Sequence, residues 1–352
     1  MRRQATTLIV SAFFALVFAV IGTQLPAPYV RLVPGPVTDT LGAVGGKPLI
    51  VVKGHATSQT KGRIYLVTVS EYGGPGKNIS GADVLSGWWS KSDAVVPRRI
   101  LFPPNVTSQE VARQDAQDMA NSQEQAKVAA LRFLGYTLKP GVDVASISAT
   151  SSAKGKLQVD DVIVGVDGKA VANSTALLAV LKSHKVGDQI TLDVNRNGVQ
   201  VEVPVALQKP PASRKDQVTP TIGIEIVDSF AKPFEIDIDL RNVGGPSAGS
   251  AFAMGLVDKL NGEDLTGGRT IAVTGTIDAQ GNVGAIGGVV QKMWGARRAG
   301  ATVFFVPKDN CAEAVKSVPG GLRLVMETTL AKNIDALKQL QAGGSNLPSC
   351  PG

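Results

Sequence analysis

A serine within a run of small residues is the strongest chemical feature of the sequence. Ser247 stands in Gly-Pro-Ser-Ala-Gly, and the stretch after it has the apolar spacing of an amphipathic helix. A helix that opens at Ser247 presents free backbone N–H groups near the hydroxyl, so the amides of Ser247 and Ala248 could hold the oxyanion of an acyl-transfer reaction. We therefore expect Ser247 to be a nucleophile.

The base that would serve this serine is not a histidine. The pentapeptide also fits the Gly-x-Ser-x-Gly pattern of α/β-hydrolases, but that fold needs a histidine after the serine. Only His55 and His184 occur, and both precede Ser247. An esterase or lipase is therefore disfavoured. A lysine can act as the base when burial lowers its pKa from about 10.4.

Lys292 is the candidate base. It lies in a predicted helix over residues 288–299, which ends at a glycine. At the helical period its side chain falls among small apolar residues, Val289, Ala296 and Ala299. Gln291 and Arg298 take the opposite side of this helix. A lysine that snorkels from the edge of a core has the same spacing, so spacing alone leaves both interpretations open.

The N-terminus predicts a membrane passage. Two arginines precede residues 5–25, which carry no charge and approach the roughly 20 residues that a spanning helix needs. The cleavage site of a signal peptide is poorly formed here, so we expect an uncleaved anchor, with the rest of the chain on the outer side of the membrane. There Cys311 and Cys350 can persist as a disulfide, although the sequence also fits two free thiols.

The remaining pattern predicts a multidomain α+β protein. Residues 26–132 read as a small β-rich region, with strands near 48–53 and 63–72. A capping box at Thr107–Glu110 predicts one long helix that ends near Arg132. A polar linker follows at 209–217, and strands then alternate with helical patterns to about residue 340.

The middle of the chain resembles a PDZ domain over residues 133–207. The resemblance rests on residues 157–171 (LQVDDVIVGVDGKAV), on residues 185–198 and on the FLGY segment that opens the region. It implies that a peptide adds as a strand beside the sheet, and that the backbone N–H groups of Leu134, Gly135 and Tyr136 capture its terminal carboxylate. The glycine also fits a simple turn in a spacer domain, so peptide binding stays a hypothesis.

The C-terminal part resembles the proteolytic domain of Lon-type serine proteases, from about residue 222 to 340. The motifs are NVGGPSAGSAFAMG, TGTIDAQGNVGAIGGVVQK and AGATVFFVPKDN. The resemblance implies that Ser247 is the nucleophile, that Lys292 is the general base and that Thr274 orients the lysine. Two positions depart from the pattern of many members, because Gly244 replaces an acidic residue and Thr276 replaces a glutamate. Control of the Ser-Lys dyad therefore differs.

The order of these parts is similar to that of membrane-anchored, secreted Lon-like PDZ proteases of bacteria. We expect a cytoplasmic start and anchor at 1–25, the β-rich region with its helix at 26–132, the PDZ-like domain at 133–207, the proteolytic domain at 218–341 and a tail at 342–352. The function predicted from this order is an ATP-independent serine endopeptidase that cleaves flexible or misfolded exported segments. A membrane-anchored PDZ adaptor with a silent protease fold is the alternative.

Partners and cofactors are limited by what the sequence lacks. No Gly-x-x-x-x-Gly-Lys-Ser/Thr phosphate loop occurs, so we expect no use of ATP. Two histidines and two cysteines are too few for a Cys/His metal cluster, and no cofactor is expected. The net charge of +7 is spread over 352 residues without a basic block, which disfavours nucleic acid. Protein or peptide substrates and the membrane remain, and the sequence leaves a homo-oligomer open.

Overall fold

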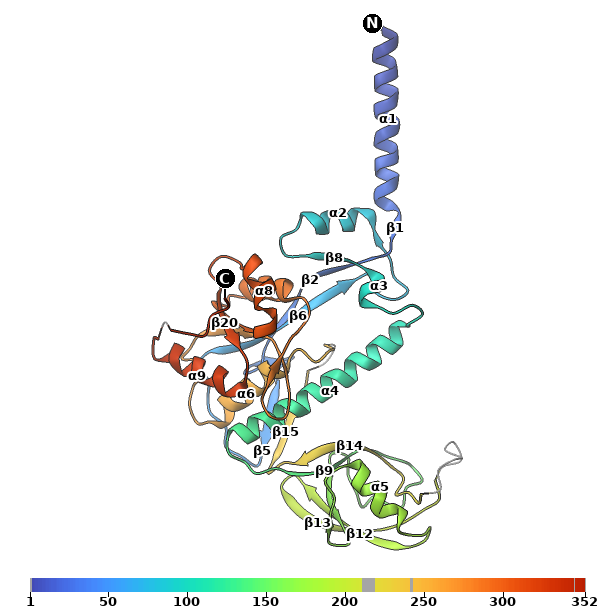
Figure 1. The fold of residues 1–352 in the computed structure, drawn as a ribbon, viewed down its shortest axis with the longest axis vertical. Coiled ribbons are helices and arrows are strands. Elements are labelled where there is room, and N and C mark those ends of the chain that lie inside the picture. The colour runs from blue at the N-terminus through green and yellow to red at the C-terminus, as the bar shows by residue number, and fades with distance from the viewer. Residues whose placement is uncertain (1, 211–218, 241–242, 345, 352) are drawn as a thin grey trace. The chain divides into compact units, whose positions relative to one another are not determined.

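The chain forms two compact units, each assembled from separate segments. The computed structural model describes residues 2–210, 219–240, 243–344 and 346–351 (Figure 1). Unit 1 comprises Met1–Leu49, Ser58–Ala126 and Asp239–Gly352, and unit 2 comprises Ile50–Thr57 and Lys127–Ile238. Most of the predicted linker at 209–217 lies outside the described residues.

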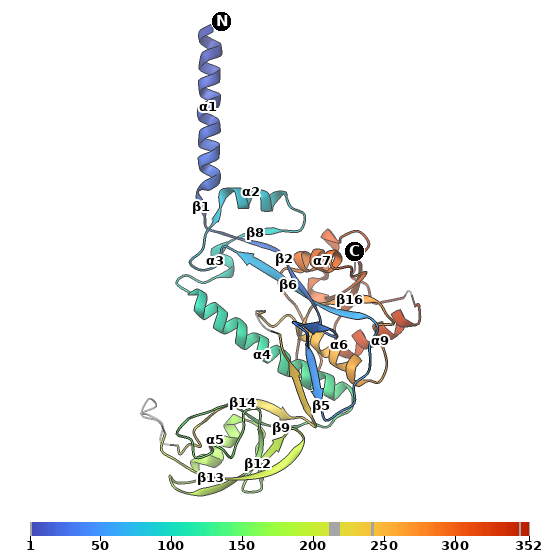
Figure 2. The ribbon, with the colours of Figure 1, turned by 180° about the vertical axis from the view of Figure 1, so that it is seen from behind.

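Unit 1 is built on a six-stranded mixed sheet with the strand order β20-β19-β16-β6-β2-β8. The strands are β2 (Tyr29–Asp39), β6 (Arg63–Tyr72), β8 (Ala94–Pro97), β16 (Thr270–Val273), β19 (Val303–Pro307) and β20 (Arg323–Glu327). β6 pairs in parallel with β16 and antiparallel with β2, so it joins the early and the late strands (Figure 2).

This sheet corrects the domain division expected from the sequence. The strands of the predicted β-rich region at 26–132 are not a separate region, because β2, β6 and β8 supply half of the sheet that carries the C-terminal strands. The other three strands of the sheet, β16, β19 and β20, come after unit 2 in the sequence. Strand propensity locates such segments but does not identify the strand with which each one pairs.

Two helices of unit 1 pack on β6 and lead to the candidate site. They are α6 (Gly249–Leu260) and α7 (Val289–Arg298). Gly288 precedes α7 with φ 65°, and a Cβ at this position would lie 2.6 Å from Val69 Cγ2 of β6. Glycine therefore allows both the left-handed backbone and the close approach of α7 to the sheet.

Smaller elements complete unit 1. α9 (Leu330–Gln341) packs against α6, and Cys311 in α8 (Cys311–Ala314) forms a disulfide with Cys350. The disulfide holds the C-terminal tail beside the last part of the sheet. The other elements are β1 (Pro26–Ala27), β3 (Ala43–Val44), β4 (Lys47–Pro48), β7 (Ile79–Ser80), α2 (Gly81–Trp89), α3 (Arg98–Leu101), β17 (Thr276–Ile277), β18 (Val283–Gly284), η1 (Lys308–Asn310) and η2 (Val315–Ser317).

Two long helices match the sequence-based expectation. α1 (Arg2–Gln24) contains one apolar stretch, Thr6–Gln24, with a mean hydropathy of 2.2 and no burial within the structure, which fits a membrane span or a signal sequence. α4 (Ser108–Phe133) confirms the predicted single helix. Its capping box is formed, because Thr107 N donates to Glu110 Oε2 at 2.8 Å and Glu110 N donates to Thr107 Oγ1 at 3.2 Å.

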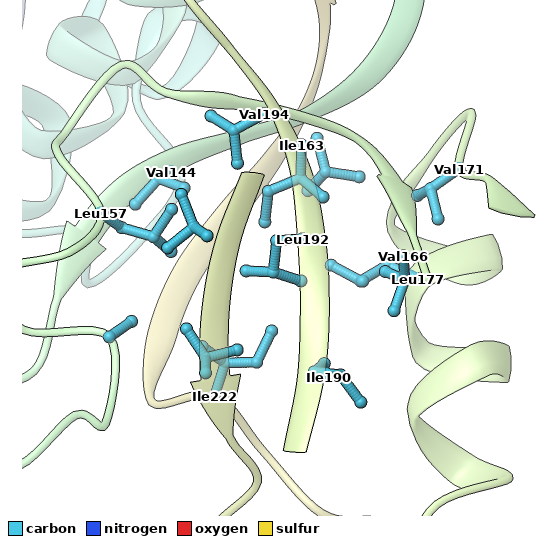
Figure 3. Close-up of a cluster of buried hydrophobic side chains, with 14 of the residues drawn as sticks. Val144, Leu157, Ile163, Val166, Val171, Leu177, Ile190, Leu192, Val194 and Ile222 are labelled. Carbon is cyan, nitrogen blue, oxygen red and sulfur yellow. The ribbon is translucent and has the colours of Figure 1, made fainter. Parts of the chain in front are cut away.

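Unit 2 is an antiparallel sheet packed on one helix, α5 (Ser174–Lys182). The strand order is β13-β12-β10-β9-β14, with β11 beside β10. Leu177 of α5 faces apolar side chains of the strands, including Ile163 and Leu192, in one buried cluster (Figure 3). The strands are β9 (Lys139–Ile147), β10 (Val162–Val166), β11 (Lys169–Ala170), β12 (Gln189–Arg196), β13 (Val199–Ala206) and β14 (Ile224–Ala231).

The end of unit 2 corrects the predicted start of the proteolytic domain at residue 218. β14 pairs with β9 over eight residues, and β15 (Glu235–Ile238) pairs with β5 (Ile50–Lys53). Both strands therefore belong to unit 2, as does residue His55. Their alternating apolar pattern predicts half-buried strands correctly, but the same pattern fits either neighbouring sheet.

Candidate active site

Three side chains from different elements meet near the start of α6. Ser247 lies two residues before α6, Thr274 directly follows β16, and Lys292 lies in the first turn of α7. Lys292 Nζ donates to Ser247 Oγ at 2.9 Å and to Thr274 Oγ1 at 3.1 Å. Thr274 Oγ1 donates to the backbone carbonyl of Ser247 at 3.3 Å. The structure brings together the three residues that the sequence singled out.

Burial gives the lysine the properties of a base. Lys292 is 3% exposed, and loss of solvent lowers the pKa of its amine from 10.5 to about 7. A neutral amine beside a hydroxyl can accept its proton. Gln291 is buried as well, so the prediction that it lies on the wet side of α7 was wrong. The buried face is wider than the apolar stripe because α7 packs against both β2 and β6.

The backbone before α6 differs from the expected helix start. We expected the helix to open at Ser247, but α6 begins at Gly249, and Ser247 and Ala248 form a turn. Within the described residues, neither of these two amide N–H groups donates to a protein acceptor. Both donors are therefore available to an oxyanion at the serine.

Helix α4 holds the loop that carries the serine, and sequence reasoning missed this contact. Gly245 N donates to the backbone carbonyl of Asp115 at 3.0 Å, and Ser122 Oγ donates to the carbonyl of Pro246 at 2.9 Å. Ser122 lies in a polar stretch of the helix, and nothing in the local pattern distinguishes it from its neighbours.

The same helix gives a physical reason for one departure from the Lon pattern. A Cβ at Gly244 would lie 2.4 Å from Asp115 Cβ, which is closer than two side chains can approach. An acidic residue at this position would therefore clash with α4. Glycine is required because α4 lies directly against the loop, and a carboxyl group reaches the neighbourhood of the loop from α4 instead.

A cavity of about 1400 Å³ opens beside the serine. Its wall includes Ser247 and Lys292, together with parts of β6, α4 and the loop before α6. Cavities of this size accept an extended peptide or a large ligand. The Ser247 hydroxyl group is therefore accessible, while the Lys292 amine is shielded from solvent.

The loop predicted to capture a peptide carboxylate has another role in the structure. The amides of Leu134, Gly135 and Tyr136 donate to the carbonyls of Ala130, Arg132 and Leu131 at 3.0 Å each. They close the C-terminus of α4, with Gly135 at φ 87°. The expectation that these three N–H groups are free to bind a ligand was wrong, because the last carbonyls of a helix compete for the same donors.

The sheet edge beside this loop is also taken. β9, the strand that follows the loop, is paired on both sides by β10 and β14. Among the described strands of this sheet, β13, β14 and the short β11 each pair on one side only, so an added peptide strand would have to pair with one of these.

The two histidines belong to unit 2. His55 Nε2 lies 2.8 Å from Tyr136 Oη, and its ring packs on Phe234. His184 lies near the carboxylates of Asp167 and Asp188. Each histidine therefore has a local structural partner, which agrees with a serine that does not use histidine as its base.

A buried carboxyl group behind the site was not predicted either. Glu327, at the end of β20, is fully buried and accepts hydrogen bonds from Ser250 Oγ at 2.7 Å and Asn333 Nδ2 at 2.6 Å. Burial raises the pKa of Glu327 from 4.5 to about 8. The carboxyl group is therefore protonated at neutral pH, and it lies where β20, α6 and α9 meet. An acidic residue at a strand end is usually exposed to solvent, so nothing in the local pattern singled out Glu327.

Replacing Glu327 by glutamine is expected to remove a loss of stability that accumulates as the pH rises from about 4.5 to 8. Because the pKa is higher in the folded chain, the folded state holds a proton that the unfolded state releases between about pH 4.5 and 8. Wild-type stability therefore falls through this window, whereas Glu327→Gln keeps the hydrogen bonds without the charge. In melting curves from pH 5 to 9, the melting temperature of the variant should increase relative to that of wild type as the pH rises. An unchanged difference between the two proteins, with exposed Glu313→Gln as the control, would contradict this assignment.

The three side chains have the arrangement of a serine-type acyl-transfer site, and comparisons with known proteins support a serine protease. The family model for the Lon protease (S16) C-terminal proteolytic domain matches residues 241–342, and that for the PDZ domain matches residues 118–207. The chain therefore contains a Lon-type proteolytic domain and a PDZ domain. A Lon-type proteolytic domain supports a serine protease.

Individual relatives cover only part of the chain. Lon protease 1 of Bacillus subtilis (strain 168) is 35% identical over 121 residues, which are 33% of this chain and 15% of that protein. Lon protease of Clostridioides difficile (strain 630) is 30% identical over 141 residues, 35% of this chain and 18% of that protein. The serine protease Do-like HtrA of Lactobacillus helveticus is 43% identical over 72 residues, 20% of this chain and 17% of that protein. The chain thus spans less than a fifth of the length of these relatives.

One solved structure with similarity is the PDZ domain of an SdrC-like protein from Listeria monocytogenes. It is 27% identical, with a TM-score of 0.23, and the match covers 26% of this chain and 92% of that domain.

Proposed function

We propose that the chain is an ATP-independent serine endopeptidase that uses a Ser-Lys dyad. The observation that carries the proposal is the 2.9 Å hydrogen bond between Lys292 Nζ and Ser247 Oγ, with an amine whose pKa is lowered to about 7. Neutral Lys292 takes the proton of Ser247 while Oγ attacks the peptide carbonyl carbon. Thr274 keeps the amine in position through its hydroxyl group.

The remaining steps use groups already next to the serine. The carbonyl oxygen becomes an oxyanion that the amides of Ser247 and Ala248 stabilise. When the tetrahedral intermediate collapses, the lysine ammonium gives its proton to the departing amine, and an acyl-serine ester remains. Water then hydrolyses the ester with Lys292 again as the base.

The substrates and their location follow from the rest of the chain. Because no phosphate loop is found in the sequence, the chain has no recognisable motor to unfold a substrate, so it acts on flexible or misfolded segments. In this proposal α1 anchors the chain in a membrane, and the arginines at its start favour an outer location for the residues that follow it. The PDZ domain positions protein or peptide substrates.

The test is cleavage of an unfolded protein without nucleotide. We expect the full chain in detergent to degrade a chemically unfolded model substrate and the Ser247→Ala variant to leave it intact, since the hydroxyl forms the covalent intermediate. Product peptides are counted by mass spectrometry, and an exposed-site variant, Ser349→Ala, serves as the matched control. Equal degradation by Ser247→Ala and wild type would disprove the mechanism. Loss of cellular function only when unit 2 is altered would favour the adaptor instead.

A further inference from the structure

One edge of β6 is open where it borders the active-site cavity. On the side of β16, pairing covers only residues 63–66 of β6, whereas β6 continues to Tyr72. Within the described residues no other strand pairs with this side beyond Leu66. The segment 67–72 therefore keeps backbone donors and acceptors that an additional strand can use.

This open edge faces the cavity. Five consecutive residues of β6, 67–71, line the same cavity as Ser247. Side chains alternate between the two faces of a sheet, so a run of consecutive lining residues means that the cavity borders the backbone edge of the strand. The lining of the cavity also includes the loop before α6, which carries Ser247.

Two carboxyl groups without a cationic partner lie on the wall of the cavity. They are Glu71, near the end of the open segment, and Asp115 of α4, which touches the loop at Gly244. No described residue forms an ion pair or side-chain hydrogen bond with either carboxyl group. The remaining carboxylate on the wall, Glu110, accepts a hydrogen bond from Thr107 and lies near Arg113.

The surroundings of both groups favour a cation. The pKa of Glu71 is raised by loss of solvent and then by the charge of Asp115, and the pKa of Asp115 is raised by loss of solvent and then by Asp118. A positive charge placed between Glu71 and Asp115 relieves this repulsion.

We propose that the substrate binds as an extended strand along the open edge of β6, and that a lysine or arginine side chain of this strand lies between Glu71 and Asp115. This inference rests on the proposed function and names its substrate class: flexible segments with a basic residue at a fixed distance from the cleaved bond. The edge supplies backbone hydrogen bonds that any sequence can make, and the carboxyl groups supply the selectivity.

Cleavage-site mapping tests the charge part of the proposal. Products from a chemically unfolded protein should show lysine or arginine enriched at one fixed position relative to the cut. In the double variant Glu71→Gln/Asp115→Asn the enrichment should disappear, and kcat/KM for substrates with that basic residue should fall about tenfold or more, since charged hydrogen bonds are lost. Asp118→Asn, which removes a neighbouring carboxylate outside the cavity wall, should keep the enrichment. An absent enrichment, or one that survives in the double variant, would overturn the proposal.

Binding to the Ser247→Ala chain tests the strand part and separates the two proposals. A peptide containing the enriched residue is N-methylated at one backbone position at a time, and affinity is measured by fluorescence anisotropy. Strand addition predicts losses at alternate positions, and losses without this alternation would contradict it. If the wild-type chain cleaves no substrate, the affinity of the Ser247→Ala chain is measured for peptides that contain lysine and for matched peptides that contain norleucine. Tighter binding of lysine that depends on Glu71 and Asp115 would then keep this inference while the proposed function fails.

Discussion

Replacement of Lys292 by methionine is expected to abolish turnover without loss of the fold. Methionine fills a similar volume but offers no lone pair to accept the Ser247 proton, and general bases contribute about 10²–10⁴ to the rate. Removing a buried amine should also stabilise the folded chain. The gain should be largest below pH 7, where both folded and unfolded wild-type chains carry the proton and the folded chain buries a charge.

The pH profile of wild type gives an independent measure of the same residue. Only the neutral amine is a base, so kcat/KM should rise about tenfold per pH unit below about 7 and level off above it. The measurement is initial rates from pH 5.5 to 9 on an unfolded substrate, with exposed Lys308→Met as the matched variant. A flat profile, or a Lys292→Met variant that retains wild-type rates, would show that another group takes the proton.

A fragment that starts at residue 219 is expected not to fold, although the sequence suggests a complete proteolytic domain there. Such a fragment lacks β2 and β6, and β6 contributes Ile64, Leu66 and Val67, each 2% exposed or less. Burial of three such side chains is worth roughly 5–9 kcal/mol in total, which is comparable with the entire stability of a domain. Near-ultraviolet circular dichroism and proteolysis of residues 219–352 should show no fixed tertiary structure.

The chain from residue 26 onward is the control for this fragment. It keeps every strand of the sheet and lacks only α1, so it should give a cooperative melting transition. A fragment 219–352 that melts cooperatively by itself would show that β6 is dispensable, and the sheet order would then need another explanation.

The sequence was informative where the decisive interactions are local. Helix α4 was predictable from its capping box, because residues close together along one helix determine it. The spacing of Lys292 relative to Val289 and Ala296 fitted burial, but it also fitted a lysine that snorkels from the edge of a core. The meeting of Ser247 with Lys292 depended on resemblance, since Ser247 lies in the turn before α6 and Lys292 lies on α7. The helix after Ser247 starts two residues later than expected, and the role of the Ser247 and Ala248 amides as oxyanion donors stays a prediction.

Long-range partners were beyond the sequence. The pairing of β6 with β16 and of β14 with β9 depends on the packing of whole faces, which a short alternating pattern does not encode. Glu327 and Ser122 were not predicted for the same reason, because each side chain forms a hydrogen bond with a residue more than 70 positions away. The Leu134–Tyr136 loop was misjudged because a helix end and a ligand can use identical N–H donors.

The sheet of unit 1 also has a consequence for synthesis of the chain. A ribosome completes β2, β6 and β8 before the main segment of unit 2, Lys127–Ile238, emerges and supplies β16, β19 and β20 only afterwards. Until then, the early strands expose apolar faces and an unpaired hydrogen-bonding edge, and this state is prone to aggregation. The sheet of unit 1 therefore cannot fold step by step from the N-terminus. Until synthesis is complete, the first hundred residues of the nascent chain must be kept from contact with other chains.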